Sequence, residues 1–356
     1  MMSMRIYIFL LTVCFTFQMR AQQVPDWENP RVVGINKEEY HSTLTLPSGK
    51  SSCEEIVSLN GRWKFYWSPD PQSRPSDFYK NNFDVSGWDN ISVPGTWQLQ
   101  GYGKPIYTNW TYPFKKDQPK VTGEPPKHFF SYENRNPVGA YVTTFDVSED
   151  MKDKQLYLHF EGVKSAMYVW INGKKVGYSQ NSMAPAEFDI TGYVEDGLEH
   201  HLVVRASSDL RSMMQSAGKQ SLLLNSHGCQ YTRTTGIWQT VWLEAVASAG
   251  LQSVHALTDI DQKQLVIHPR FYRDSYKNTL RIVLQENNKK IGTVCVKAAN
   301  SSVAVFSLKN VRVWSPESPF LYDVLYQVLD ENGKVIDEVT SYVGMRKVHI
   351  EGNKIY

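Results

Sequence analysis

Cysteine is scarce in this sequence of 356 residues, which contains four cysteines. We expect Cys14 to be removed, because it lies in an apolar leader near the start of the chain. The other three, Cys53, Cys229 and Cys295, are an odd number at wide spacing. Such a set is neither a disulfide framework nor a zinc site, because both rely on characteristic cysteine spacings. We therefore expect buried free thiols, with at most one incidental bridge.

An excess of charge of one sign is also absent. Lysine and arginine number 38 against 36 aspartates and glutamates, which gives a formal net charge of +2. Proteins that bind nucleic acid or an anionic membrane surface commonly carry a basic excess, because they neutralise phosphate groups. We therefore expect no nucleic acid and no membrane surface among the partners of this chain.

Long apolar runs are missing beyond the leader. Ile6–Phe17 is a run of about twelve residues, too short for the roughly 20 that span a bilayer. A basic residue precedes the run, and a plausible processing site follows at Ala21. We therefore predict a signal peptide at residues 1–21, a secreted or periplasmic protein, and no membrane span. A lipoprotein signal at Cys14 is disfavoured, because Val13 is large where a small residue is required.

Helical periodicity is absent as well. No stretch of about fifteen residues shows the period of 3.6 that predicts an amphipathic helix. This absence excludes a parallel βαβ fold and a complete TIM barrel from the chain. Aromatic residues make up 13% of the sequence, and their flat, wide side chains favour β structure.

Short β segments separated by turn residues take the place of helices. From Leu156 to Glu161 apolar and polar residues alternate, which is the period of two expected of a half-buried strand. Asn172-Gly173 and Asn332-Gly333 each stand near or between strand-like runs. This dipeptide favours the tight turn of a β-hairpin, so we predict hairpins at both places.

The character of the sequence changes twice along the chain. The segment up to about Cys53 is polar and has little periodicity, which indicates an extended arm. From Ser58 the β segments begin. After Val246 about seven short strands follow in roughly a hundred residues, and this density fits an immunoglobulin-like sandwich. The chain is therefore predicted to be all-β, with two β domains in tandem.

Sets of residues typical of a catalytic, metal-binding or nucleotide-binding site are not evident in the sequence. Acid–base catalysis by carboxylates requires two of them on rigid supports and close in space, whereas neighbours such as Glu149-Asp150 point to opposite faces of a strand. Glu54-Glu55 fails for the same reason, and Asp259 and Asp261 fall in a polar turn. His200-His201 lacks the spacing of metal ligands. No nucleophile elbow, P-loop or dinucleotide fingerprint is present.

A series of motifs nevertheless follows in a recognisable order. In the first part of the chain they are Asp26–Pro30 (DWENP), Ser58–Phe65 (SLNGRWKF), Val93–Gln98 (VPGTWQ), Pro105–Pro113 (PIYTNWTYP) and Asn136–Tyr141 (NPVGAY). Further along they are Phe160–Ala166 (FEGVKSA), Val176–Ser179 (VGYS), Glu187–Ile190 (EFDI), Thr235–Gln239 (TGIWQ), Trp314–Pro319 (WSPESP) and Val343–Lys347 (VGMRK). Together they resemble the long multidomain β-galactosidases of glycoside hydrolase family 2, over nearly all of the chain after the leader.

The resemblance implies a domain organisation. It implies an arm at residues 22–57, a jelly-roll (galactose-binding-like) β-sandwich at 58–247 and an immunoglobulin-like β-sandwich at 248–345. Residues 346–356 then begin a TIM barrel that is missing from this sequence. In that family the acid/base and nucleophile glutamates both lie in the barrel, so no catalytic residue is expected in this chain. The reaction implied for the whole protein is retaining hydrolysis of terminal β-galactosides through a glycosyl-enzyme intermediate.

Two residues are implied to contact substrate. Asn109 matches a family position at which the jelly roll reaches the galactoside, and its amide can both donate to and accept from a sugar hydroxyl. Asp209 is the candidate for an acidic residue that binds substrate and a sodium ion. The sequence around it, Ser207–Ser212, departs from the family pattern, so a surface aspartate is an equal alternative. Taken without the resemblance, Asn109 reads as an asparagine that bonds its own turn.

The cofactors and partners also follow from the resemblance. The magnesium ligands lie downstream, so no metal or cofactor is expected in this chain, while magnesium and sodium are implied for the full-length enzyme. The implied partners are a β-galactoside, the missing TIM barrel and, in the full-length protein, further copies in a homo-oligomer. Two alternatives stay open, namely a free-standing carbohydrate-binding β-sandwich protein and a family 2 hydrolase that acts on β-mannosides or β-glucuronides.

Overall fold

The computed structural model of the chain describes residues 26–29, 31–41, 55–103, 127–128, 137–151, 153–195, 198–207 and 235–355. These residues form β-strands and short 3-10 helices, namely η1 (Asp26–Glu28), η2 (Trp97–Gln100), η4 (Glu149–Met151) and η5 (Thr191–Tyr193). The all-β prediction is confirmed. In the described ranges, no helix has the length and hydropathy needed to cross a bilayer.

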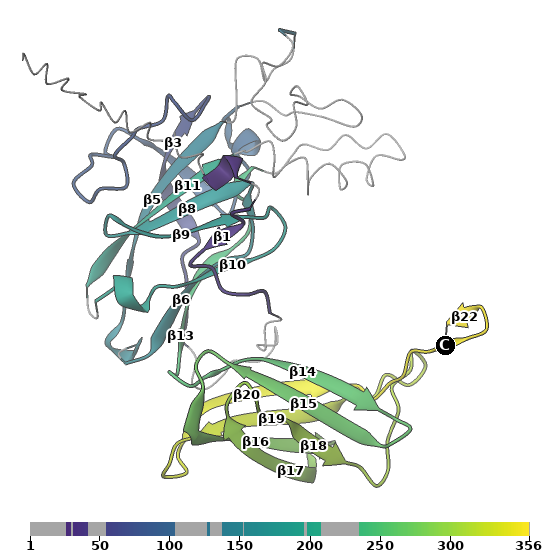
Figure 1. Cartoon of the computed structure of the whole chain (residues 1–356). Helices are drawn as coiled ribbons and strands as arrows, with labels where there is room; N and C mark the ends of the chain where they lie inside the picture. Colours follow the sequence, from purple (N-terminus) through teal and green to yellow (C-terminus); the bar gives the residue numbers. More distant parts are fainter. Residues whose placement is uncertain are drawn as a thin grey trace, which may run out of the picture.

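The first sandwich is built from two antiparallel sheets (Figure 1). The larger has the order β1–β9–β8–β11–β5–β3–β4, with β1 (Gly34–Ile35), β9 (Lys174–Gln180), β8 (Ala166–Ile171), β11 (Glu199–Ser207), β5 (Val138–Asp146), β3 (Gly61–Ser68) and β4 (Asp89–Val93). The smaller has the order β10–β6–β13–β2, with β10 (Ala186–Asp189), β6 (Gln155–Phe160), β13 (Val241–Val246) and β2 (Glu55–Ser58). A short pair, β7 (Val163–Lys164) with β12 (Gly236–Ile237), lies beside them.

The core of this sandwich follows from the alternation of side chains along each strand. On β6, Leu158 and Phe160 point inward and are fully buried with Leu243 of β13 and Phe188 of β10. The hairpin at Asn172-Gly173 is confirmed between β8 and β9, where the two residues have φ of 50° and 78°. Positive φ at both positions is what a two-residue turn of this type requires.

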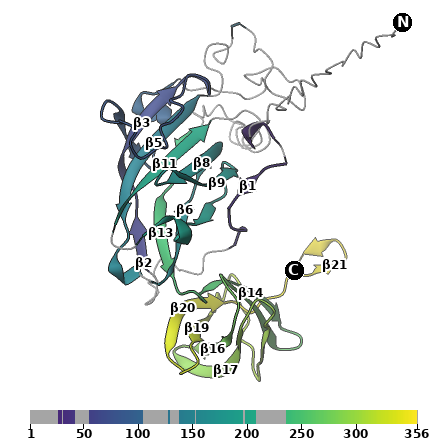
Figure 2. The same ribbon diagram turned by 60° about the vertical axis from the view of Figure 1, so that its left-hand side comes forward.

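The second sandwich has the expected immunoglobulin-like pattern. One sheet has the order β14–β15–β18, with β14 (Leu251–Asp259), β15 (Gln264–Phe271) and β18 (Ala304–Ser307). The other has the order β17–β16–β19–β20, with β17 (Lys289–Ala298), β16 (Ser275–Glu286), β19 (Tyr322–Leu329) and β20 (Val335–Val343). Residues of both sheets alternate between the core and the surface. A final hairpin, β21 (Ile350–Glu351) with β22 (Lys354–Ile355), extends away from the sandwich (Figure 2).

Three sequence-based expectations can be compared with the second sandwich. The predicted hairpin at Asn332-Gly333 is confirmed, because these residues form the turn between β19 and β20. Asp261 lies in the turn after β14, where it pairs with Lys347, so its assignment to a polar turn is confirmed, whereas Asp259 is the last residue of β14 and pairs with Gln264. The expectation of buried thiols is wrong for Cys295, which is exposed. It lies on the outer face of the edge strand β17, opposite Arg281.

The N-terminal arm packs along the first sandwich. Its strand β1 pairs with β9, and the backbone N–H of Glu38 donates to the carbonyl of Glu187 at 2.9 Å. At its start, the Trp27 ring lies 4.7 Å from the buried guanidinium of Arg205, and Asp26 accepts a hydrogen bond from Tyr168 at 2.8 Å. Burial lowers the pKa of Arg205 to about 10, which leaves its guanidinium charged at neutral pH. The arm is therefore held by a stacked cation at one end and by backbone bonding at the other.

Candidate functional site

The two residues predicted to contact sugar, Asn109 and Asp209, lie outside the described residues. Three strands next to them in sequence are described. β11, which precedes Asp209, ends at Ser207, and Ser207 pairs with Val138 at the start of β5, the strand that follows Asn109. The chain before Asp209 and the chain after Asn109 therefore meet at one end of the seven-stranded sheet, whereas β4, which precedes Asn109, ends at Val93 opposite Gly61 at the other end of β3.

A buried hydrogen-bond network joins three of the sequence motifs near this end. The indole Nε1 of Trp97 donates to the hydroxyl of Tyr141, which also accepts the backbone N–H of Ile237 at 3.4 Å. Burial raises the pKa of Tyr141, so its phenol stays neutral. The backbone N–H of Trp97 donates to Thr235 Oγ1 at 3.3 Å, and Thr235 donates to Gln98 Oε1 at 2.7 Å. The network fixes residues 97–98 to residues 235–237 across a long separation in sequence.

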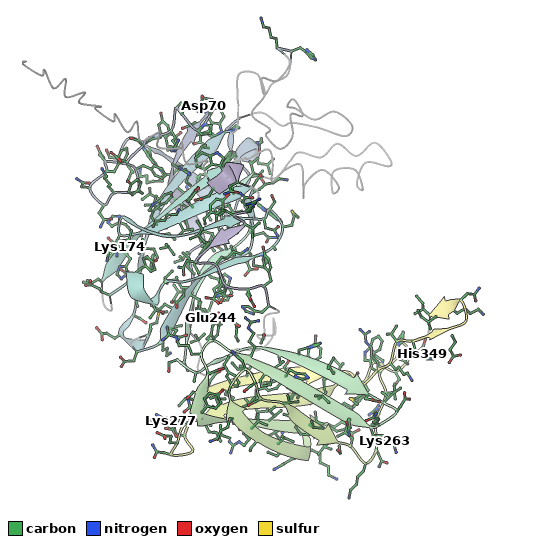
Figure 3. All side chains as sticks on the ribbon, viewed as in Figure 1. Asp70, Lys174, Glu244, Lys263, Lys277 and His349 are labelled. Carbon is green, nitrogen blue, oxygen red and sulfur yellow. The ribbon has the colours of Figure 1, made fainter. Side chains whose placement is uncertain are left out.

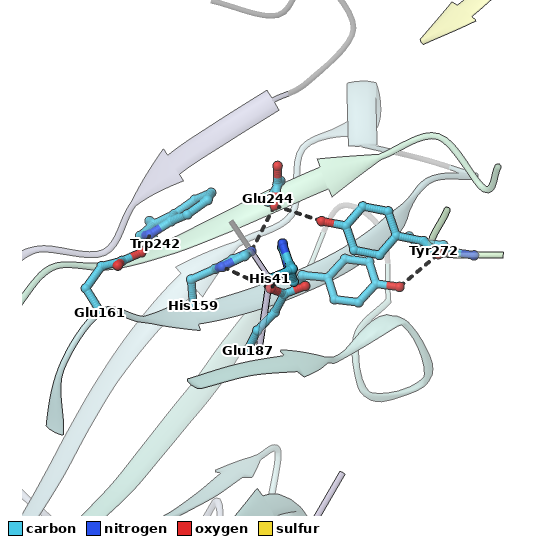
Figure 4. Close-up of polar contacts among 9 residues, drawn as sticks. His41, His159, Glu161, Glu187, Trp242, Glu244 and Tyr272 are labelled. Carbon is cyan, nitrogen blue, oxygen red and sulfur yellow. Dashed lines mark hydrogen bonds and ion pairs between the residues drawn. The ribbon is translucent and has the colours of Figure 1, made fainter. Parts of the chain in front are cut away.

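The most concentrated group of ionisable side chains lies elsewhere, on the outer face of the smaller sheet. Figure 3 shows Glu244 where the first sandwich faces the second, and Figure 4 shows the group in close-up. His159 of β6 stands opposite Glu187 of β10 on one side and Trp242 of β13 on the other. Glu244 is two residues beyond Trp242 and so points to the same face. We call His41, His159, Glu187 and Glu244 the junction cluster.

Contacts within the junction cluster form a chain of alternating acids and bases. His159 Nε2 lies 2.9 Å from Glu244 Oε2, and its Nδ1 lies 3.7 Å from Glu187 Oε2. The same oxygen of Glu187 lies 2.7 Å from His41 Nε2. The His159 ring is stacked on Trp242 with centroids 3.8 Å apart and an interplanar angle of 9°. The indole of Trp242 is itself fixed, because it donates to Glu161 at 2.9 Å.

The second sandwich also contacts the junction cluster and the arm. Tyr272 follows β15, and its hydroxyl donates to Glu244 Oε2 at 3.4 Å. Its ring packs on Tyr157 of β6 with centroids 4.4 Å apart. Arg270 pairs with Glu39 of the arm at 2.6 Å. The cluster is therefore a joint to which the arm and both sandwiches contribute.

Because this joint is buried, one expectation from the sequence is wrong. The alternation from Leu156 to Glu161 predicted a half-buried strand, but every residue of β6 is buried. The polar side of the strand is covered by the arm and by the second sandwich. His159, Glu187 and Glu244 are 4%, 8% and 6% exposed, so an external substrate does not reach them. The cluster is therefore a buried joint between the arm and the two sandwiches.

Burial and like charge also perturb an acid of the arm at this joint. The pKa of Glu38 is raised above 4.5, first by burial and then by the nearby carboxylates of Glu187 and Asp189. Burial likewise raises the pKa of Tyr157, which stays a neutral phenol. In the described part of the chain, no three histidine, cysteine, aspartate or glutamate side chains are placed to hold a metal ion.

Comparison with known proteins gives matches over both sandwiches. The model of the glycosyl hydrolases family 2 sugar binding domain matches residues 56–245, and a second model of glycosyl hydrolases family 2 matches residues 251–346. The β-galactosidase of Halalkalibacterium halodurans is 34% identical over 88% of this chain and 30% of its own length. That of Priestia megaterium is 31% identical over 95% of this chain and 33% of its own length. The chain thus spans about a third of these relatives.

Solved structures of other proteins have the same two-sandwich fold as this chain. The β-glucuronidase of Ruminococcus gnavus in complex with D-glucaro-d-lactam has a TM-score of 0.59 and 16% identity over 88% of this chain and 49% of its own. The β-glucuronidase of Lactobacillus rhamnosus has a TM-score of 0.61 and 16% identity over 88% of this chain and 48% of its own. At this level of identity the likeness concerns the two-sandwich arrangement and carries no information on the sugar.

Proposed function

The chain belongs to glycosyl hydrolase family 2, and from that premise we propose that it is the non-catalytic amino-terminal part of a β-galactosidase. The reaction of the complete enzyme is then retaining hydrolysis of terminal β-galactosides by two carboxylates. The observation that carries the proposal is the likeness to β-galactosidases along nearly the whole chain, with the two family domains in order. The carboxylates that perform the chemistry lie outside residues 1–356 in this proposal.

The proposal assigns these residues a supporting role. The jelly roll contributes Asn109, and Asp209 as a second candidate, to the rim of the sugar site. The buried network of Trp97, Tyr141 and Thr235 supports the assignment, because it holds the described chain on either side of these positions in one place. The binding partners of these domains are a β-galactoside and the TIM barrel of the same enzyme, which itself forms a homo-oligomer.

The remaining parts of the proposal concern the cellular location and the metal ions of the enzyme. The apolar leader supports a secreted or periplasmic location, with cleavage after Ala21. Magnesium and sodium belong to the complete enzyme. In this proposal the magnesium ligands belong to the rest of the enzyme, and Asp209 is a candidate sodium ligand of this chain.

The complete enzyme should prefer nitrophenyl β-galactoside over the matching β-mannoside and β-glucuronide. Replacing Asn109 with alanine should lower kcat/KM for the galactoside about 10- to 100-fold, the effect of losing hydrogen bonds to one sugar hydroxyl pair. Steady-state kinetics on the three substrates measure both effects. Asn90, an exposed residue of β4, provides the matched control, and Asn90→Ala should leave kcat/KM unchanged.

Two results would contradict the proposal in different ways. Turnover of the galactoside by purified residues 22–356 alone, with host enzyme excluded, would mean that these residues carry the catalytic carboxylates. Preference of the complete enzyme for a mannoside or glucuronide would keep the family and change the sugar. A free-standing carbohydrate-binding protein predicts a third result, saturable binding of galactose by residues 22–356 with no hydrolase activity in any longer form.

A further inference from the structure

The N-terminal arm begins on the outer face of the seven-stranded sheet, where its first residues contact three neighbouring strands (Figures 1 and 2). The carboxylate of Asp26 accepts a hydrogen bond from Tyr168 of β8 at 2.8 Å, and its backbone carbonyl accepts one from Gln180 of β9 at 2.9 Å. The Cζ of Arg205 on β11 lies 4.7 Å from the centroid of the Trp27 ring. We call Asp26, Trp27, Tyr168, Gln180 and Arg205 the arm clip.

Aromatic rings are the main support of the Arg205 guanidinium. Arg205 is 7% exposed, and its Cζ also lies 4.3 Å from the centroid of Tyr168. Its Nε is buried without a hydrogen-bond partner, and in the described ranges no acceptor bonds the rest of the guanidinium. Burial lowers the pKa of Arg205, and repulsion from Arg74 then lowers it more than attraction to Asp26 raises it. A buried cation with so little electrostatic support depends on its contact with the negative faces of the Trp27 and Tyr168 rings.

Arg205 stands two residues before the end of β11. That strand ends at Ser207, which pairs with Val138 of β5 and with Ala166 of β8, and the chain continues from there to Asp209. Removal of the Trp27 ring opens the guanidinium to water, and a long cationic side chain turns toward water when it is free to do so. We therefore expect the last residues of β11 to move more freely when Trp27 is absent.

We propose that Trp27 and Arg205 are positioning residues for the sugar site of the complete enzyme. Stacking of the arm on Arg205 keeps the end of β11, which leads to Asp209, in the position that binds the galactoside. This role rests on the proposed function, because that function places Asp209 as a candidate at the rim of the sugar site. The two residues act on substrate binding rather than on the chemical step, since the carboxylates of the proposed enzyme lie outside this chain.

Steady-state kinetics of the complete enzyme on nitrophenyl β-galactoside test the arm clip. Trp27→Ala should raise KM about tenfold and leave kcat within about twofold, because a fall of the binding-competent fraction to a tenth weakens apparent binding tenfold. Trp27→Phe keeps a ring against the guanidinium and should return KM to within about threefold of the wild type. A variant that is merely less stable loses active enzyme, so its apparent kcat falls while its KM stays the same.

Trp88→Ala is the matched control, because it removes the same kind of side chain from the same sheet. Trp88 packs on Tyr66, Phe78 and Phe83 beside the edge strand β4. This variant should lower Tm and leave KM at the wild-type value. Should Trp27→Ala fail to fold, Tyr168→Phe replaces it, since it removes only the hydroxyl that donates to Asp26. Tyr168→Phe should raise KM about threefold through the loss of one hydrogen bond in the arm clip.

Hydrogen exchange followed by mass spectrometry gives a second readout that does not depend on turnover. Trp27→Ala should speed exchange in peptides that contain residues 205–207 and leave peptides of β15 in the second sandwich unchanged.

The outcomes separate this role from the proposed function. A wild type that hydrolyses the galactoside together with a Trp27→Ala enzyme of wild-type KM would overturn the positioning role alone, and so would equal exchange at residues 205–207 in the two proteins. A wild-type complete enzyme that does not hydrolyse the galactoside would contradict the proposed function and, with it, the role of the arm clip.

Discussion

Replacing Gly236 with alanine is expected to abolish folding of the first sandwich. Gly236 has a φ of +71°, in the left-handed region that side chains with a Cβ rarely adopt. An added Cβ would overlap the indole Nε1 of Trp97 and the hydroxyl of Tyr141, and it would lie 2.8 Å from Trp97 Cδ1. Both rings are buried and hydrogen-bonded to each other, so neither can move away without breaking the network.

The cost of this substitution therefore combines backbone strain, steric overlap and a lost buried hydrogen bond. Together they should exceed about 4 kcal/mol, a large part of the stability of an ordinary domain. Gly333→Ala separates strain from overlap, because Gly333 has a similar φ of +80° with nothing near its Cβ position. It should cost about 1 kcal/mol. Urea unfolding followed by tryptophan fluorescence measures both, and equal midpoints for the two variants would contradict the role given to Gly236.

The sequence predicts the architecture well because strand patterning and turn chemistry are local. The Asn172-Gly173 hairpin needs two residues that accept positive φ, and that requirement is visible in the dipeptide itself. The alternation along β19 likewise reflects a single buried face, and the burial of Tyr322, Val324 and Tyr326 follows it. Where an element faces one core, its own residues are sufficient to place it.

The junction cluster was not predicted, because its members come from distant parts of the chain. His41 and Glu187 are separated by 146 residues, and neither belongs to a recognisable ligand motif. The sequence feature that could have indicated the cluster is the polar side of β6. There Tyr157 and His159 have larger side chains than a solvent-exposed strand face needs. That face is buried by the packing of a second domain, which strand periodicity does not encode. Cys295 was misplaced for a related reason, since edge position depends on the order of strands in the sheet.

Truncating Glu244 to alanine is expected to cost about 3–5 kcal/mol, because it removes the buried carboxylate that lies 2.9 Å from His159 and accepts the Tyr272 hydroxyl. Replacing His159 and Glu244 together by leucine should cost less than the sum of the two single replacements, since the double variant retains no isolated buried charge from this pair. The large expected cost depends on the burial of this pair, because exposed ion pairs contribute little to stability. The ion pair of Lys277 with Glu331 has side chains 77% and 64% exposed, and Glu331→Ala should change stability by less than about 0.5 kcal/mol.

A double-mutant cycle at about pH 6, built from urea unfolding of the wild type, His159→Leu, Glu244→Leu and the double variant, measures the coupling of the pair. We expect a coupling of about 2 kcal/mol, at the upper end for residues in contact. Additive single effects would mean that Glu244 stabilises the joint by packing and through Tyr272 rather than through its contact with His159.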